Sequence, residues 1–97
     1  MSIRPFEKPE EDLEVLDYEL GDKASIIVYN DEVNTFDWVI SSFVEILYHT
    51  AEQAEQLSML IHYKGKANVK GGPKTELKPL KDALVDRGLS AVIEEGV

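Results

Sequence analysis

The stretch SIIVYNDEVNTFDWVISSFVEILY, which covers residues 25–48, decides the fold. Its first five residues are mostly β-branched or aromatic and predict a short buried strand. That strand ends at a polar turn over residues 30–32, after which Asn34 or Thr35 can cap a helix. Apolar side chains then recur at helical spacing at Phe36, Val39, Ile40, Phe43, Val44, Leu47 and Tyr48. The stretch therefore predicts a strand, a turn and an amphipathic helix.

The residues that follow predict a second helix and a weaker second strand. Thr50 and Gln53 have the T-x-x-Q spacing of a capping box, which starts a helix, and Gly65 suits the C-terminal end of that helix. Residues 66–70 (KANVK) are a weak strand candidate. Residues 71–73 (GGP) predict a break, because Gly and Pro interrupt regular structure.

A third helix and a last strand complete the expected order. Thr75 can cap this helix, Pro79 is tolerable near its first turn, and Gly88 ends it. Residues 89–94 (LSAVIE) predict the final strand. The order β-α-α-β-α-β predicts an α+β fold, in which a small three-stranded antiparallel sheet packs against three helices that lie on one of its faces.

Composition fits one compact domain and excludes several classes of function. The chain has 97 residues, of which 43% are hydrophobic, and none is cysteine, which excludes disulfides and thiolate metal sites. No apolar run approaches the roughly 18 residues of a membrane span, and no signal peptide is recognisable, so we expect a cytoplasmic protein. A net charge of −9 disfavours nucleic acids and anionic membranes as partners and favours a basic group or a free ammonium. Acidity that only maintains solubility is the simpler alternative.

Residues 1–23 differ from the rest of the chain. They are rich in acidic residues and lack a sustained apolar period, so we expect a flexible acidic N-terminal extension before a core domain over residues 24–97. The acidic residues of this extension are Glu7, Glu10, Glu11, Asp12, Glu14, Asp17, Glu19 and Asp22. Composition does not decide whether the extension is inert or functional.

Three features of the sequence can carry chemistry. The polar residues 30–32 follow a buried strand, where loops often hold functional groups, although a plain turn with a helix cap is the commoner explanation. His62 and Ser58 fall on the apolar stripe of the second expected helix. Each is a binding candidate, but a half-buried histidine with a hydrogen-bond partner and a close helix contact at the serine are the commoner explanations.

An enzyme is not expected from this inventory of residues. His49 and His62 are the only histidines, and the motifs of hydrolases, zinc proteases and nucleotide-binding proteins do not occur. Nothing supplies a nucleophile together with an oxyanion site. Trp38 and its aromatic neighbours are expected to be core or pocket-wall residues. We also expect no metal and no cofactor.

Two segments resemble the motifs of one known family. VYNDEVNTF, residues 28–36, resembles the "NDD-x-(T/N)-(P/T)-(M/F)" segment of ClpS adaptors, and IHYKGKA, residues 61–67, resembles their "V-H-x-x-G-K-A" segment. The separation of the two segments is also that of the family, and the similarity extends over about residues 24–95. The resemblance implies a monomeric adaptor that binds proteins by a free α-amino group and a first residue that is Leu, Phe, Tyr or Trp. Such an adaptor docks on the N-terminal domain of a Clp AAA+ unfoldase and delivers its cargo to ClpP.

The resemblance also implies roles for individual residues. The α-amino group would be received by Asn30, Asp31, Glu32 and His62. The pocket for the first side chain would be lined by Val28, Asn34, Phe36, Val39, Ser58, Ile61 and Leu89. Contact with the unfoldase would involve Glu76 and Lys81.

The chain departs from the family pattern at several positions. Glu32 stands where aspartate is usual, Phe36 where methionine is common, and Ser58 replaces a frequent methionine, which should enlarge or wet the pocket floor. The segment between Thr75 and Leu89 is shorter than in many members, so we expect a brief third helix. A module of the same fold that docks on the unfoldase but has lost recognition of the first residue is therefore an alternative. A domain like the C-terminal domain of the ribosomal stalk is another.

Overall fold

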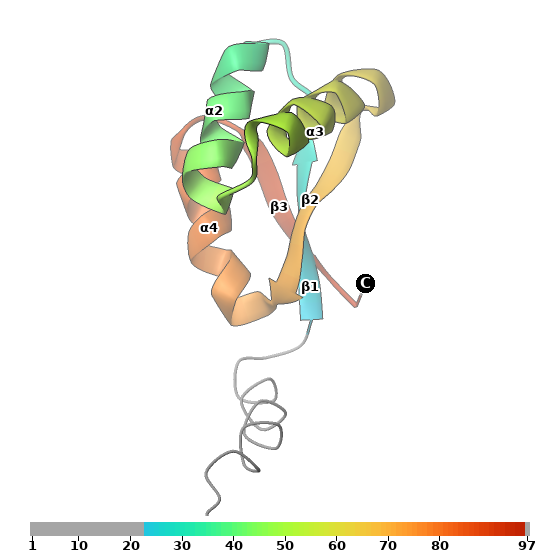
Figure 1. The fold of residues 1–97 in the computed structure, drawn as a ribbon. Helices are drawn as coiled ribbons and strands as arrows, with labels where there is room; N and C mark the ends of the chain where they lie inside the picture. The colour runs from blue at the N-terminus through green and yellow to red at the C-terminus, as the bar shows by residue number, and fades with distance from the viewer. Residues whose placement is uncertain (1–22, 97) are drawn as a thin grey trace, which may run out of the picture.

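The computed structural model describes residues 23–96 and has the predicted α+β architecture (Figure 1). The elements in chain order are β1 (Lys23–Tyr29), α2 (Phe36–Leu47), α3 (Ala51–Lys64), β2 (Lys66–Pro73), α4 (Lys74–Asp86) and β3 (Ser90–Glu95). The predicted order β-α-α-β-α-β and the three-stranded antiparallel sheet are confirmed. The predicted N-terminal extension lies outside the described residues, apart from Lys23, which is the first residue of β1.

The sheet has the strand order β2-β1-β3, and both neighbours run antiparallel to β1. The last residue of β1, Tyr29, pairs with Lys66 at the start of β2 and with Ser90 at the start of β3. The end of β1 therefore meets the end of α3 and the connection between α4 and β3. This register brings together three chain segments that are far apart in the sequence.

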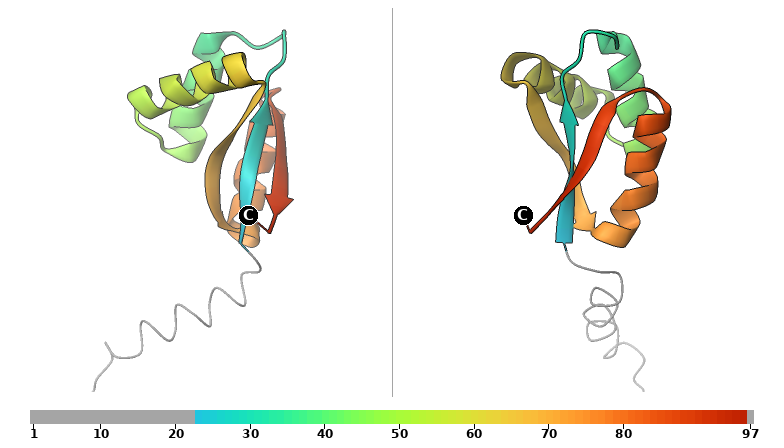
Figure 2. Two further views of the ribbon diagram at one scale, coloured as in Figure 1. Left: turned by 90° about the vertical axis from the view of Figure 1, so that its right-hand side faces the viewer. Right: turned by 180° about the vertical axis from the view of Figure 1, so that it is seen from behind.

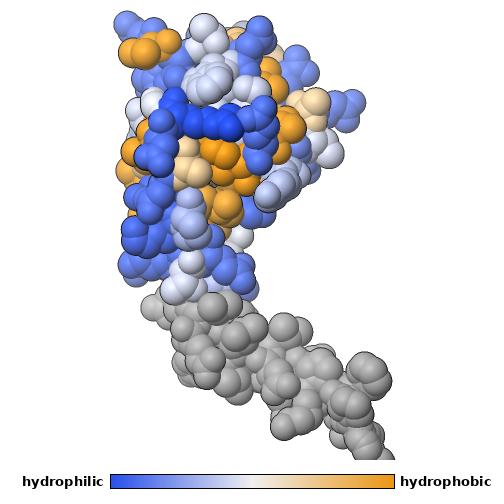
Figure 3. Space-filling view, turned by 90° about the vertical axis from the view of Figure 1, so that its left-hand side faces the viewer, coloured by the Kyte–Doolittle hydropathy of each residue, from blue (hydrophilic) through white to orange (hydrophobic). Residues whose placement is uncertain are grey.

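The three helices lie on one side of the sheet, and the left view of Figure 2 looks onto the other side. Alternate residues of β1, namely Ala24, Ile26 and Val28, enter the core under the helices. The helices contribute the buried side chains of Phe43, Leu47, Ala54, Ile61, Leu77 and Leu84. The face that carries α2 and α4 shows apolar side chains gathered between hydrophilic ones (Figure 3).

The ends of α2 and α3 follow from local sequence. Thr35, not Asn34, caps α2, because its hydroxyl accepts a hydrogen bond from the Trp38 backbone N–H at 3.1 Å. The predicted capping box of α3 is present, with Thr50 and Gln53 each bonding the other's backbone N–H. Tyr48, predicted as part of the apolar stripe of α2, instead ends the helix in a left-handed conformation and is exposed.

Two predictions about the second half of the chain are wrong. Residues 71–73 do not break the structure, since β2 continues to Pro73 and each of these three residues pairs with a residue of β1. The edge position tolerates Pro73, and Gly72 adopts a φ of 152° that other residues rarely adopt. Thr75 is not the helix cap, because α4 begins at Lys74 with Pro73 in the capping position and no side-chain cap.

The third helix is also longer than expected. α4 has 13 residues, and Pro79 lies inside it, beyond the first turn. Proline in a helix interior removes one backbone hydrogen bond, so packing of the apolar side chains at Leu77 and Leu84 must offset that cost. Arg87 is the C-cap of α4, and Gly88 follows it with a φ of 91°. The last strand begins at Ser90, one residue later than predicted.

Between residues 23 and 96, no helix combines the length and the apolar character needed to cross a bilayer. Within the same part of the chain, no group of three or more histidine, aspartate or glutamate side chains is arranged to hold a metal ion.

Candidate functional site

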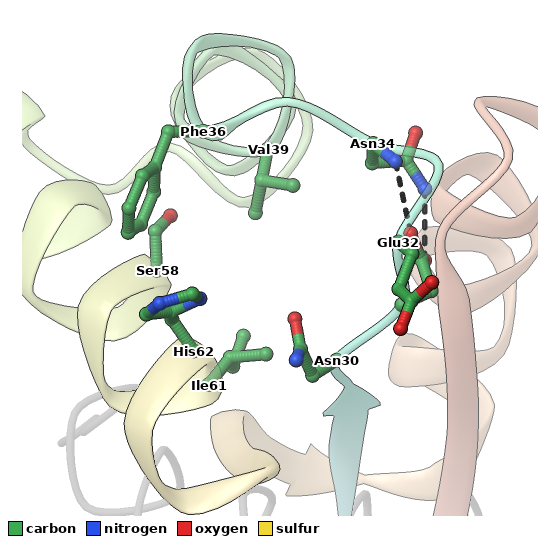
Figure 4. Close-up of a pocket in the computed structure, with 9 residues that line it drawn as sticks. Asn30, Glu32, Asn34, Phe36, Val39, Ser58, Ile61 and His62 are labelled. Atoms are coloured by element: carbon green, nitrogen blue, oxygen red, sulfur yellow. Dashed lines mark hydrogen bonds between the residues drawn. The ribbon is translucent and has the colours of Figure 1, made fainter.

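A hollow of about 400 Å³ opens where the segment after β1 faces α3. Figure 4 shows its lining side chains arranged around an open centre. They are Asn30, Asp31, Glu32, Asn34, Phe36, Val39, Ser58, Ile61 and His62. All nine belong to the candidate residues that the sequence indicated, and they come from the turn, the first turn of α2, and the second half of α3.

One backbone hydrogen bond fixes the turn against α3. The Asn30 N–H donates to the Gly65 carbonyl at 2.9 Å. Gly65 ends α3 in a left-handed conformation, which only a residue without a side chain adopts readily. Asn30 is thereby held near the last turn of α3, where His62 is located. The two family-like segments therefore meet at this point.

Asp31 shapes the turn from inside. Its Oδ1 accepts hydrogen bonds from the backbone N–H groups of Val33 and Asn34, each at 2.9 Å, and its Oδ2 accepts from Asn34 Nδ2 at 2.9 Å. The backbone N–H of Asn34, aided by its side chain and by Val33, holds the pKa of Asp31 below its usual value against the opposing effect of burial. Asp31 lines the hollow, but both of its oxygens already serve the turn.

Replacing Asp31 by Asn is expected to destabilise the domain by about 1 kcal/mol at neutral pH, because charge-assisted hydrogen bonds become neutral ones. A lowered folded pKa means that the carboxylate stabilises the fold above its unfolded pKa of about 3.9. This stabilisation is lost as the pH falls through the lowered pKa. Urea unfolding of both proteins should therefore show a stability gap that closes in strong acid. A gap of equal size at every pH would contradict this role for Asp31.

A second set of contacts joins the turn to the connection between α4 and β3. Asn34 Nδ2 also donates to the Gly88 carbonyl, and Trp38 Nε1 donates to the Arg87 carbonyl, each at 2.9 Å. The Arg87 guanidinium lies 5.3 Å from the centre of the Trp38 ring and pairs with Glu45 at 2.6 Å. Trp38 is thus neither core nor pocket wall, and the sequence carries no signal for its pairing with Arg87.

The polar rim of the hollow consists of Asn30, Glu32 and His62. Within residues 23–96 these three side chains have no hydrogen-bond or ion-pair partner, and all three are exposed. The expectation of a half-buried His62 with a partner is therefore wrong. Its ring lies beside the ring of Phe36, 5.6 Å away between centroids, and beside that of Tyr63, 5.0 Å away. The rim therefore has acceptor groups that remain free for a ligand.

One wall of the hollow, which lies beside His62, is apolar and contains one small polar residue. Phe36, Val39 and Ile61 present hydrocarbon to the hollow. Ser58, on α3, is buried, and its hydroxyl donates to the Ala54 carbonyl at 2.8 Å. The serine therefore faces the pocket, as one of the two interpretations of the sequence proposed. Its only proton is directed back into its own helix.

The remaining candidate residues lie elsewhere. Val28 and Leu89 are buried and line an adjoining hollow of about 30 Å³, which shares Asn30, Asp31, Asn34, Val39 and Ile61 with the larger one. Glu76 and Lys81 lie on α4. Lys81 faces a different groove beside β3 and pairs with Asp82 at 2.8 Å.

Comparison with known proteins identifies the chain's relatives. Residues 20–91 match the family described as "ATP-dependent Clp protease adaptor protein ClpS". An ATP-dependent Clp protease adapter protein ClpS of Streptomyces coelicolor is 32% identical over 69 residues, which are 71% of this chain and 72% of that protein. The protein of the same name from Corynebacterium diphtheriae is 33% identical over 70 residues, which are 72% of this chain and 62% of that protein.

A solved structure shares the fold. It is titled "The structure of Agrobacterium tumefaciens ClpS2 bound to L-phenylalaninamide" and aligns with a TM-score of 0.66 and 17% identity, covering 77% of this chain and 98% of that chain. At this identity the likeness supports the fold, while the family match and the curated relatives support descent. The chain therefore belongs to the ClpS family of ATP-dependent Clp protease adaptor proteins.

Proposed function

We propose that this chain binds proteins by a free α-amino group and a bulky hydrophobic first residue, namely Leu, Phe, Tyr or Trp, and delivers them to a Clp AAA+ unfoldase and its ClpP protease. The observation that carries the proposal is the pairing, in one hollow, of a free polar rim with an apolar wall. The first residue of a protein carries a free α-amino group and a side chain on the same Cα atom, and these two groups match the rim and the wall. L-phenylalaninamide, the ligand named for the Agrobacterium relative, has the same pair.

The rim suits an ammonium group. A free α-amino group has an ordinary pKa of about 7.7–8.0, so it is largely charged at neutral pH and offers three donors. Asn30, Glu32 and the imidazole of His62 each have an atom on the rim that can accept a hydrogen bond. Hydrogen bonds to a charged group contribute about 1.5–3 kcal/mol each when well formed. Asp31 adds negative charge nearby while its oxygens hold the turn.

The apolar wall suits the first side chain. Burial of hydrocarbon against Phe36, Val39 and Ile61 contributes about 25 cal/mol for each Å² removed from water. A large side chain gains far more from this burial than Gly or Ala. The rigid ring of Phe36 also narrows the entrance, which should exclude first residues branched at Cβ.

Delivery requires a second surface that leaves the hollow open. We assign contact with the N-terminal domain of the unfoldase to Glu76 and Lys81 on α4, an element that contributes no residue to the hollow. The adaptor would act as a monomer and without a cofactor. The N-terminal extension would contribute to delivery and not to peptide capture.

Exchange of the first residue tests the proposal. A fluorescent peptide that begins with Phe is expected to bind about 10- to 100-fold more tightly than the same peptide beginning with Gly, because the Phe side chain is buried in the hollow. Fluorescence anisotropy titration measures both affinities.

Equal affinities would contradict the proposal. They would favour the alternative that the chain is an interaction module that docks on the unfoldase without recognising a first residue. Titration of the isolated unfoldase N-terminal domain in parallel separates the two, since the alternative retains that binding.

A further inference from the structure

We infer that the hollow prefers first residues whose aromatic ring carries a hydrogen-bond donor, Trp and Tyr, because Ser58 offers that donor an acceptor inside the apolar wall. This inference rests on the proposed function and adds a specificity that the family resemblance does not supply.

The hydrogen bonding of Ser58 leaves its oxygen as an acceptor. The residue lines the hollow, yet it is only 3% exposed. A serine hydroxyl has one proton to donate and two lone pairs to accept with. The proton is used in the 2.8 Å bond to the Ala54 carbonyl, one helical turn earlier. The hydroxyl oxygen can still accept a hydrogen bond from a ligand in the hollow.

The surroundings of Ser58 make this acceptor distinctive. Phe36, Val39 and Ile61, which share the wall with it, have no polar side-chain atoms. The free acceptors of the rim would be engaged by the α-amino group of the same ligand. Among the side chains of this wall, Ser58 is the one that has an acceptor, so an indole N–H or a phenol O–H buried there can bond to it.

The small size of Ser58 also favours a large aromatic first residue. A serine leaves more of the hollow of about 400 Å³ open than a long side chain would leave at this point of α3. Figure 4 shows Ser58 between Phe36 and His62, at the edge of the open centre of the hollow. A two-ring side chain therefore has both space and a hydrogen-bond partner there.

Two ligand pairs isolate the hydrogen bond from the size of the ring. Tyr differs from Phe by the hydroxyl, and Trp differs from benzothienylalanine by an N–H in place of sulfur at nearly equal volume. Otherwise identical labelled peptides carrying each of the four first residues are titrated by anisotropy. We expect the donor-bearing member of a pair to bind about three- to tenfold more tightly, the effect of one neutral hydrogen bond.

Two variants provide the matched comparison. Ser58→Ala removes the acceptor and is expected to bring the affinity ratio within each pair close to one. Ser42→Ala is the control, because Ser42 is equally buried and makes the same bond to the carbonyl four residues earlier, Trp38, at 2.8 Å, but does not line the hollow. This control should keep the ratios of the unmodified protein.

The outcomes separate this inference from the function on which it rests. A preference for the donor-bearing member in at least one pair that disappears in Ser58→Ala and persists in Ser42→Ala supports the inference. Tight binding of the Phe peptide with no such preference, or with a preference that Ser58→Ala leaves unchanged, overturns the inference alone. Failure of all four peptides to bind overturns the proposed function and the inference with it.

Discussion

Acetylating the α-amino group of a peptide that begins with Phe is expected to reduce its affinity for the chain about 100-fold. Acetylation removes the positive charge and leaves one N–H where three donors had been. Asn30, Glu32 and His62 would then face a neutral group that cannot satisfy all of them. Loss of two charge-assisted hydrogen bonds of at least about 1.5 kcal/mol each corresponds to a factor of this size.

The measurement compares the free and acetylated peptides in the same anisotropy titration. The two ligands share every side chain, so burial of the Phe ring against the apolar wall is the same in both. Raising the salt concentration should weaken the free peptide more than its acetylated form, because salt screens the attraction between the exposed rim and an ammonium. Similar affinities of the two forms would contradict recognition of the α-amino group.

Replacing His62 by Ala is expected to weaken binding of the free Phe peptide about 10- to 100-fold. The imidazole is a rim acceptor with no competing hydrogen-bond partner within residues 23–96. Its removal deletes one hydrogen bond to a charged group, about 1.5–3 kcal/mol. It also removes the ring contact with Phe36 across 5.6 Å. Because His62 is exposed, the substitution should leave the free energy of unfolding nearly unchanged.

His49→Ala is the matched control for this substitution. The Nε2 of His49 lies 2.7 Å from the Val69 carbonyl, beside the register shift in β2, and His49 does not line the candidate hollow. Its removal should lower the free energy of unfolding by about 0.5–1.5 kcal/mol and leave the peptide affinity unchanged. If His62→Ala bound the peptide as well as the unmodified chain, His62 would not be part of the site.

Much of the fold was predictable because local sequence and packing agree. Thr50 and Gln53 form their capping box from residues three apart, and Gly65 ends α3 for a purely local reason. The Gly-Gly-Pro stretch at residues 71–73 was mispredicted because its pairing with β1 decides its conformation. The start of α4 was mispredicted for a related reason, since the end of β2 at Pro73 sets where the helix begins.

The candidate site was predictable to the extent that it resides in two short segments. Asn30 and His62 could each be singled out by residue type and position. The engagement of Asp31 with the turn depends on the backbone conformation of residues 31–34, which residue type alone does not fix. The bonds from Asn34 to Gly88 and from Trp38 to Arg87 join parts of the chain about 50 residues apart, so only the folded arrangement reveals them.

Chemical-shift mapping with L-phenylalaninamide tests most directly whether the hollow receives a first residue. This small ligand consists of little more than an α-amino group and a bulky side chain, so its binding tests recognition of these two groups. The account predicts saturable shifts of the backbone amides at residues 30–36 and 58–62, with α4 little affected. Saturable shifts confined to the groove between α4 and β3, or no shifts at millimolar ligand, would contradict it.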